Sequence, residues 1–129
     1  MSIDGGTELA RVVLYDRELD IAVLALDTGD VPALRFDRDV AAEDPVAVVG
    51  YPQDGPFDVQ TGRVRAMQNL RSPDIYGEGT VVREVFSLRA LVRPGNSGGP
   101  IITPQGRVGG VVFAILLYAL ATRMLVNLW

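Results

Sequence analysis

Short apolar runs recur along the whole chain, and clusters of glycine, proline, aspartate or asparagine separate them. The runs lie at 9–15, 21–26, 46–49, 58–67, 81–92, 101–102 and 108–114. Apolar segments of this length with turn residues between them are typical of β-strands. No long stretch repeats its apolar residues with the 3.6-residue period of an amphipathic helix. The sequence therefore predicts an all-β fold.

The residue types that are absent narrow the possible chemistry. The 129-residue chain is 48% hydrophobic, enough for a core, and it contains no cysteine, no histidine and no lysine. Disulfides, thiol nucleophiles, cysteine zinc sites and lysine Schiff bases are thereby excluded. The commonest metal ligand and general base, histidine, is missing as well. We expect neither a metal nor a cofactor.

Charge is distributed unevenly along the chain. The net charge is −4, with −9 in residues 1–60 and +5 in residues 61–129. A basic half can indicate a nucleic-acid surface. Here all 12 basic residues are arginines, scattered singly and without interleaved aromatics. We expect solvated strand faces and no nucleic-acid partner.

The C-terminal region is unusually apolar. Residues 108–122 are uncharged, and a glycine pair lies near the start of this run. The run is shorter than the stretch of about 20 apolar residues that a membrane helix needs. We therefore expect two buried strands here. A small membrane-associated protein anchored by residues 108–129 is the weaker alternative. Residues 1–6 have neither the basic start nor the apolar stretch of a signal peptide.

The heptapeptide Pro-Gly-Asn-Ser-Gly-Gly-Pro at 94–100 carries a candidate nucleophile. A catalytic serine needs a sharp turn that presents its hydroxyl, and flanking glycines allow strained backbone and close approach of a substrate. In such a turn the amides of Gly95 and Ser97 can converge on a developing oxyanion. The alternative is a glycine-rich β-turn with an incidental serine.

A second candidate is Asp20, which precedes the apolar run at 21–26. A carboxylate at the mouth of a buried strand can hold and orient an imidazole. Taken alone, an aspartate here is more simply a surface residue at the start of a strand.

Together, Asp-Ile-Ala-Val-Leu at 20–24 and Gly-Asn-Ser-Gly-Gly-Pro at 95–100 resemble the trypsin-like (chymotrypsin-fold) serine proteases of the HtrA-like branch. The 77-residue separation of Asp20 and Ser97 is also typical of that branch. The segments 48–52, 61–64, 87–94 and 106–114 extend the resemblance over nearly the whole chain. The segment 72–77 is closest to the membrane-anchored periplasmic acid-resistance proteases of actinobacteria, the MarP type.

The resemblance implies a chymotrypsin-like double β-barrel, with residues 1–36 ending the first barrel and residues 37–129 forming most of the second. It implies Ser97 as the nucleophile and Asp20 as the orienting carboxylate, with an oxyanion hole at Gly95, Asn96 and Ser97. The specificity pocket would be formed by Leu91, Val112, Phe113 and Ala114. An apolar Leu91 at its base argues against a preference for lysine or arginine.

The family's histidine is missing: only 19 residues precede Asp20 and none is histidine. The simplest interpretation is an N-terminal truncation, so we expect a serine endopeptidase family member that is inactive in this chain alone. The alternative is an inactive peptide-binding module or a gene fragment.

The family also has a loop after residue 114 and a C-terminal helix, and neither is evident in 115–129, so exposed apolar surface is expected. We further expect peptide or protein substrates and a periplasmic or extracytoplasmic location. Any membrane anchor would precede residue 1, and the sequence does not indicate an oligomeric state.

Overall fold

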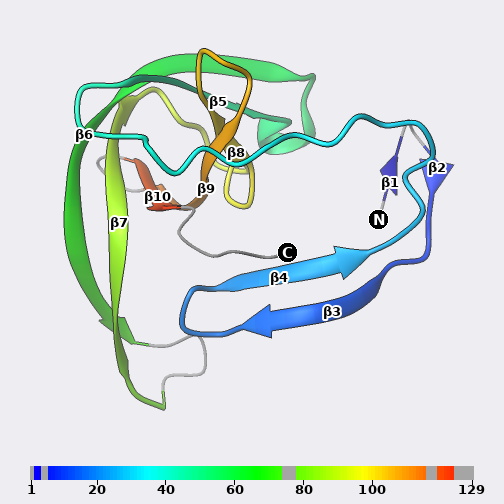
Figure 1. The fold of residues 1–129 in the computed structure, drawn as a ribbon, viewed down its shortest axis with the longest axis horizontal. Helices are drawn as coiled ribbons and strands as arrows, with labels where there is room; N and C mark the ends of the chain where they lie inside the picture. Colours follow the sequence, from blue (N-terminus) through cyan, green and yellow to red (C-terminus); the bar gives the residue numbers. More distant parts are fainter. Residues whose placement is uncertain (1, 4–5, 74–77, 116–118, 124–129) are drawn as a thin grey trace. The chain divides into compact units, whose positions relative to one another are not determined.

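The computed structural model describes residues 2–3, 6–73, 78–115 and 119–123. Within these residues the regular elements are β-strands and one 3-10 turn, so the predicted all-β class is confirmed. The chain divides into two compact units, residues 1–33 with 72–81 and residues 34–71 with 82–129. Figure 1 follows the chain through both units.

The first unit consists mainly of two small antiparallel pairs. β1 (Ser2–Ile3) pairs with β2 (Gly6–Thr7), and β3 (Arg11–Asp16) pairs with β4 (Ile21–Ala25). Asp16 stabilises the turn between β3 and β4, because its Oδ1 accepts hydrogen bonds from the amides of Glu18 (2.9 Å) and Leu19 (3.0 Å). Such local bonds are a common role of aspartate in turns.

The run at 21–26 was predicted to form a buried strand, and the prediction of burial is wrong. The strand exists as β4, but its residues are half-buried or exposed, and Leu24 is 38% exposed. On β3, residues 11–15 are all exposed, including Val12 and Tyr15. The physical reason is that a two-stranded ribbon has no second layer of its own to cover either face.

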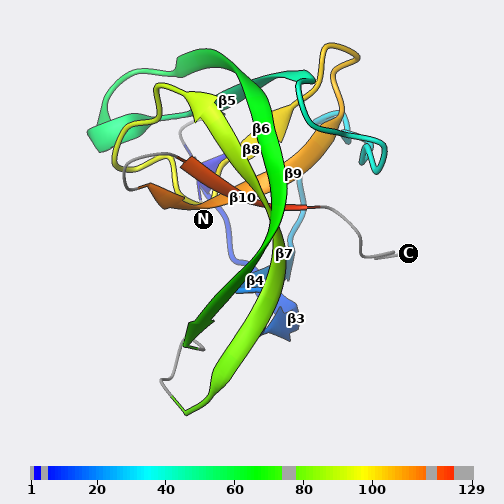
Figure 2. The same cartoon turned by 90° about the vertical axis from the view of Figure 1, so that its left-hand side faces the viewer.

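The second unit contains a closed barrel with the strand order β10-β7-β6-β5-β8-β9. Figure 2 shows β6 and β7 running side by side as a long ribbon. The strands are β5 (Pro45–Gly50), β6 (Asp58–Pro73), β7 (Thr80–Ala90), β8 (Pro100–Ile102), β9 (Val108–Ile115) and β10 (Ala119–Arg123). Closure leaves no unpaired strand edge in this ring.

The barrel core is built from β-branched and other large apolar side chains. Val46 and Val48 alternate with less buried neighbours on β5, as expected for one face of a strand. The buried cluster comprises Val40, Val46, Val48, Val64, Phe86, Leu88, Ile101 and Val112. All of these lie in the second unit, which therefore contains the main hydrophobic core of the described residues.

In the C-terminal region, residues 108–115 and 119–123 form strands, as expected, whereas residues 116–118 and 124–129 and the side-chain burial from residue 114 onward lie outside the described part of the structure. β9 pairs with β8 on one side and with β10 on the other, and β10 also pairs with β7. Within the described residues, no helix combines the length and apolar character needed to cross a membrane.

Candidate active site

Ser97 lies at the surface of a tight turn between β7 and β8, as the heptapeptide predicts. Its neighbours Gly95 and Gly98 have φ angles of +98° and +88°. These are left-handed values that side chains with a Cβ adopt only with strain. The glycines therefore allow the sharp turn that leaves Ser97 exposed while Asn96, beside it, is 2% exposed.

Backbone hydrogen bonds fix the turn internally and to β9. The amide of Asn96 donates to the carbonyl of Arg93 (3.2 Å), and that of Gly99 donates to the carbonyl of Asn96 (2.9 Å). Two further bonds join Val112, one from the Gly98 amide to its carbonyl (2.6 Å) and one from its amide to the carbonyl of Gly99 (2.9 Å). The C-terminal side of the turn is thus attached to β9.

The amides of Gly95 and Ser97 take no part in this network. Among the hydrogen bonds that the structure gives for the described residues, neither amide acts as a donor. Two amides that flank the exposed serine and are not used in the turn are available to an incoming oxygen atom. Donors without an acceptor of their own are one requirement of an oxyanion hole.

Asn96 fills the space beneath the turn. A Cβ at Gly50 would lie 2.8 Å from Asn96 Oδ1, so only glycine leaves room for this side chain without a shift. Asn96 Oδ1 is buried and has no hydrogen-bond partner among the described residues. A buried, unpaired oxygen is costly, and such groups in native structures call for an explanation.

Asp20 belongs to the first unit and Ser97 to the second, so the surroundings of each residue are described within its own unit. Asp20 lies at the end of the β3–β4 turn, is exposed, and has a φ of +56°, which aspartate tolerates better than most residues. No hydrogen bond given for the described residues involves its carboxylate.

The predicted pocket residues have different environments. Leu91 is 65% exposed, whereas Val112 is fully buried in the barrel core and its backbone is hydrogen-bonded to the turn. Phe113 is half-buried, and the side chain of Ala114 lies outside the described part of the structure.

Comparison with protein families identifies the family of the chain. A family model described as a trypsin-like peptidase domain matches residues 1–111, a stretch that includes both Asp20 and Ser97. The chain belongs to the trypsin-like peptidase family. The predicted family resemblance is therefore confirmed.

Two curated relatives place the chain within this family. Serine protease Rv3671c of Mycobacterium tuberculosis is 43% identical over 106 residues, which are 81% of this chain and 27% of the relative. A probable periplasmic serine endoprotease, DegP-like, of Halomonas elongata is 30% identical over 114 residues, 86% of this chain and 23% of the relative. The chain thus spans about a quarter of the length of these relatives.

Solved structures show the same fold. The active form of the Rv3671c protease superposes with a TM-score of 0.88 at 36% identity, over 95% of this chain and 57% of that chain. The HtrA-type protease AlgW with a decapeptide matches with a TM-score of 0.78 at 25% identity, over 94% of this chain and 38% of that chain. The chymotrypsin-like fold and the HtrA-like branch are confirmed, and the M. tuberculosis match agrees with the actinobacterial subgroup. A non-catalytic binding module is not favoured.

One contact of the turn at 94–100 was not predicted from the sequence. The segment between β5 and β6 contains a 3-10 turn, η1 (Pro52–Asp54), that contacts the turn at 94–100. The amide of Gln53 donates to the carbonyl of Pro94 (3.2 Å), and a Cβ at Gly95 would lie 2.7 Å from Gln53 N. The Gly50-Tyr51-Pro52 sequence indicates a turn at this point, but the segment that this turn contacts lies more than 40 residues later in the chain.

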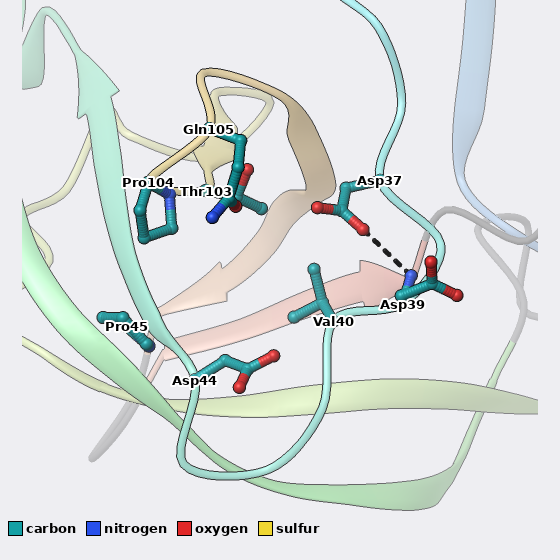
Figure 3. A pocket seen from close by; sticks show the side chains of 8 residues that line it. All are labelled: Asp37, Asp39, Val40, Asp44, Pro45, Thr103, Pro104 and Gln105. Atoms are coloured by element: carbon teal, nitrogen blue, oxygen red, sulfur yellow. Dashed lines mark hydrogen bonds between the residues drawn. The ribbon is translucent and has the colours of Figure 1, made fainter.

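An acidic cavity of about 310 Å³ lies elsewhere in the peptidase barrel (Figure 3). It is lined by Asp37, Asp39, Val40, Asp44, Pro45, Thr103, Pro104 and Gln105. Asp37 Oδ1 accepts a bond from the amide of Asp39 (3.0 Å), and Asp44 Oδ2 accepts one from the amide of Ala41 (2.9 Å). These carboxylates stabilise the chain that leads into β5. Among the described residues, no group of three or more acidic side chains is arranged to hold a metal ion.

Proposed function

We propose that this chain carries the nucleophile of a serine endopeptidase, with Ser97 as the attacking residue. The observation that supports this most strongly is the turn at 94–100, where an exposed serine is flanked by two amides with no acceptor among the described residues. Ser97 Oγ would attack the scissile carbonyl carbon, and its proton would pass to a base. The base would give this proton to the leaving amine as the scissile C–N bond breaks, and water would then hydrolyse the acyl-enzyme on Ser97.

The amides of Gly95 and Ser97 would stabilise the oxyanion during this attack. Removing one such donor in a comparable site costs about 10²–10³-fold in kcat. Asn96 would act in this hole by filling the space beneath it, because its side chain is buried and its amide already donates to Arg93.

The proton acceptor would be a histidine oriented by Asp20. The chain contains no histidine, so this group would come from outside the given sequence. The domain division proposed from the resemblance fits this requirement: residues 1–36 would complete a first barrel, and residues 37–129 would form most of a second. An unassisted serine hydroxyl is a weak nucleophile. The chain alone would therefore not turn over peptides measurably.

The specificity pocket would be formed by Leu91, Val112, Phe113 and Ala114, and β9 would pair with the acyl half of a peptide. An apolar Leu91 would favour apolar over basic side chains. The substrates would be peptides or proteins in a periplasmic or extracytoplasmic compartment, since the H. elongata relative is named as a periplasmic endoprotease. The whole protein would be anchored to the membrane through a segment that precedes residue 1.

Two hydrolysis assays with a fluorogenic peptide library test this function. In the first, the chain alone and its Ser97→Ala variant should hydrolyse the library equally and at background rate. In the second, the matched segment of the M. tuberculosis protease is replaced by this chain. Hydrolysis by this chimera should fall by about 10⁶-fold, or to background, on Ser97→Ala. A chimera whose activity does not depend on Ser97 would contradict the assignment.

A further inference from the structure

Two exposed aromatic side chains lie in the segment between β5 and β6. Tyr51 and Phe57 are 63% and 58% exposed, and their rings meet edge to face with centroids 5.6 Å apart. Exposed aromatic residues in contact form an apolar patch that can bind a further ring, because aromatic groups attract one another in this geometry. The nucleophile mechanism makes no use of either side chain.

The segment that carries this pair is attached to the nucleophile turn. Gln53 lies between the two aromatic residues in sequence, and its amide donates to Pro94 (3.2 Å). Gln53 and Asp54 both adopt left-handed φ angles, +57° and +55°. Non-glycine residues in this region are strained, and such strain is concentrated at functional sites. The segment that carries the aromatic pair is thus attached to the turn at Gln53 and strained there.

The nucleophile turn has different neighbours at its two ends. Gly98 and Gly99 are bonded to Val112 of β9, whereas Pro94 and Gly95 contact Gln53. A peptide whose acyl half lies along β9 would therefore continue past Ser97 towards the segment 51–57. The residues after the scissile bond would be the ones to meet the aromatic pair.

We infer that Tyr51 and Phe57 form a specificity subsite for an aromatic or large aliphatic side chain on the leaving-group side of a bound peptide. This inference rests on the proposed function, which sets the direction of the peptide. The ligand is an extended peptide with one such side chain. Ring contact and burial of the ligand side chain supply the preference.

Binding to the 129-residue chain tests the subsite without requiring catalysis. The probes are a fluorescein-labelled decapeptide of glycine and serine with one central phenylalanine and its alanine counterpart, measured by fluorescence polarisation. The chain should bind the phenylalanine peptide about tenfold more tightly. The double variant Tyr51→Ala/Phe57→Ala should reduce this preference to below about twofold. Val82→Ala, which removes another exposed apolar side chain, should retain it. No preference in the parent chain, or one that survives the double variant, would overturn the subsite.

The chimera separates this inference from the proposed function. With substrates that carry phenylalanine or alanine after the scissile bond, the double variant should lose the kcat/KM preference for phenylalanine and keep Ser97-dependent turnover. An unchanged preference refutes the placement on the leaving-group side. A chimera without Ser97-dependent turnover contradicts the proposed function, and the polarisation result then still decides whether the aromatic pair binds the probe.

Discussion

At the residue scale, glycines determine how closely the turn at 94–100 packs against η1. Gly95 combines a left-handed φ with a contact that a Cβ would make with backbone, 2.7 Å from Gln53 N. Gly106, in the β8–β9 turn, also has a left-handed φ, +73°, but open space around it. A substitution at Gly106 therefore tests backbone strain alone, whereas one at Gly95 tests strain together with steric overlap.

We predict that Gly95→Ala destabilises the chain more than Gly106→Ala does. Both substitutions impose left-handed strain of about 1–2 kcal/mol. Only Gly95→Ala adds overpacking against rigid backbone, which costs about 1–3 kcal/mol more. Urea unfolding of both variants measures the difference, and equal free energies of unfolding would show that the turn can move away from Gln53.

Asn96 gives a second prediction at this scale. Asn96→Asp places a carboxylate where the side chain is 2% exposed, whereas Asn69→Asp places one on the exposed part of β6. Burial without a partner disfavours the charged form and raises the pKa of the new carboxyl in the folded state above its unfolded value of about 3.9. The folded state then binds more protons than the unfolded state.

Stability of Asn96→Asp should therefore fall as pH rises from about 4 towards 7, because the unfolded state ionises first. At pH 7 we expect a loss of about 2 kcal/mol or more relative to Asn69→Asp, with the difference shrinking near pH 4. Unfolding at several pH values checks this. A pH-independent difference would mean that the introduced carboxylate finds a donor or reaches water.

At the element scale, the strands of the barrel could largely be predicted, because their pattern is local. The apolar run at 46–49 predicts β5, and the runs at 101–102 and 108–114 predict β8 and β9. The prediction for β6 ended at Met67, but the strand continues to Pro73, since pairing with β7 extends it beyond its apolar run. The exposure of β4 could not be predicted, because burial depends on which layers cover a strand.

For the candidate site, too, the local features could be predicted from the sequence and the long-range contacts could not. Exposure of Ser97 and the left-handed glycines follow from the heptapeptide itself. The packing of Asn96 against Gly50 and the support by Gln53 could not be predicted from local sequence. Both contacts join residues more than 40 positions apart, and no local pattern encodes such a pair. The same holds for the environment of Leu91, which is exposed here.

The supporting segment 51–55 gives an element-scale prediction. Gln53→Gly should stabilise the chain by about 1 kcal/mol, because glycine removes the left-handed penalty at φ +57° for a smaller entropic cost. Gln68→Gly, on the extended β6, should instead destabilise it by a similar amount. Thermal and urea unfolding of both variants measure the effect. A loss of stability for Gln53→Gly would indicate that side-chain contacts, not backbone strain, dominate at this position.

At the scale of the whole molecule, stability is distributed unevenly between the two units. Every residue of the buried cluster lies in the second unit, in a closed barrel. In the first unit, β3 and β4 form a two-stranded sheet with exposed apolar residues on it: Val12, Val13, Leu14, Tyr15 and Leu24. An isolated two-stranded hairpin is marginally stable in water. The units are therefore expected to open at different free energies.

We predict that backbone amides of residues 11–25 exchange with deuterium much faster than those of β5 and of residues 85–88. Local opening ranges from about zero for poorly buried elements up to the global free energy for core strands. Hydrogen exchange followed by mass spectrometry on the 129-residue chain gives both rates in one experiment. In the chimera with the M. tuberculosis protease, protection of residues 11–25 should rise if added strands cover this hairpin. Equal protection of both regions in the chain alone would show that a partner, such as a second copy, already covers β3 and β4, and dilution would then restore the difference.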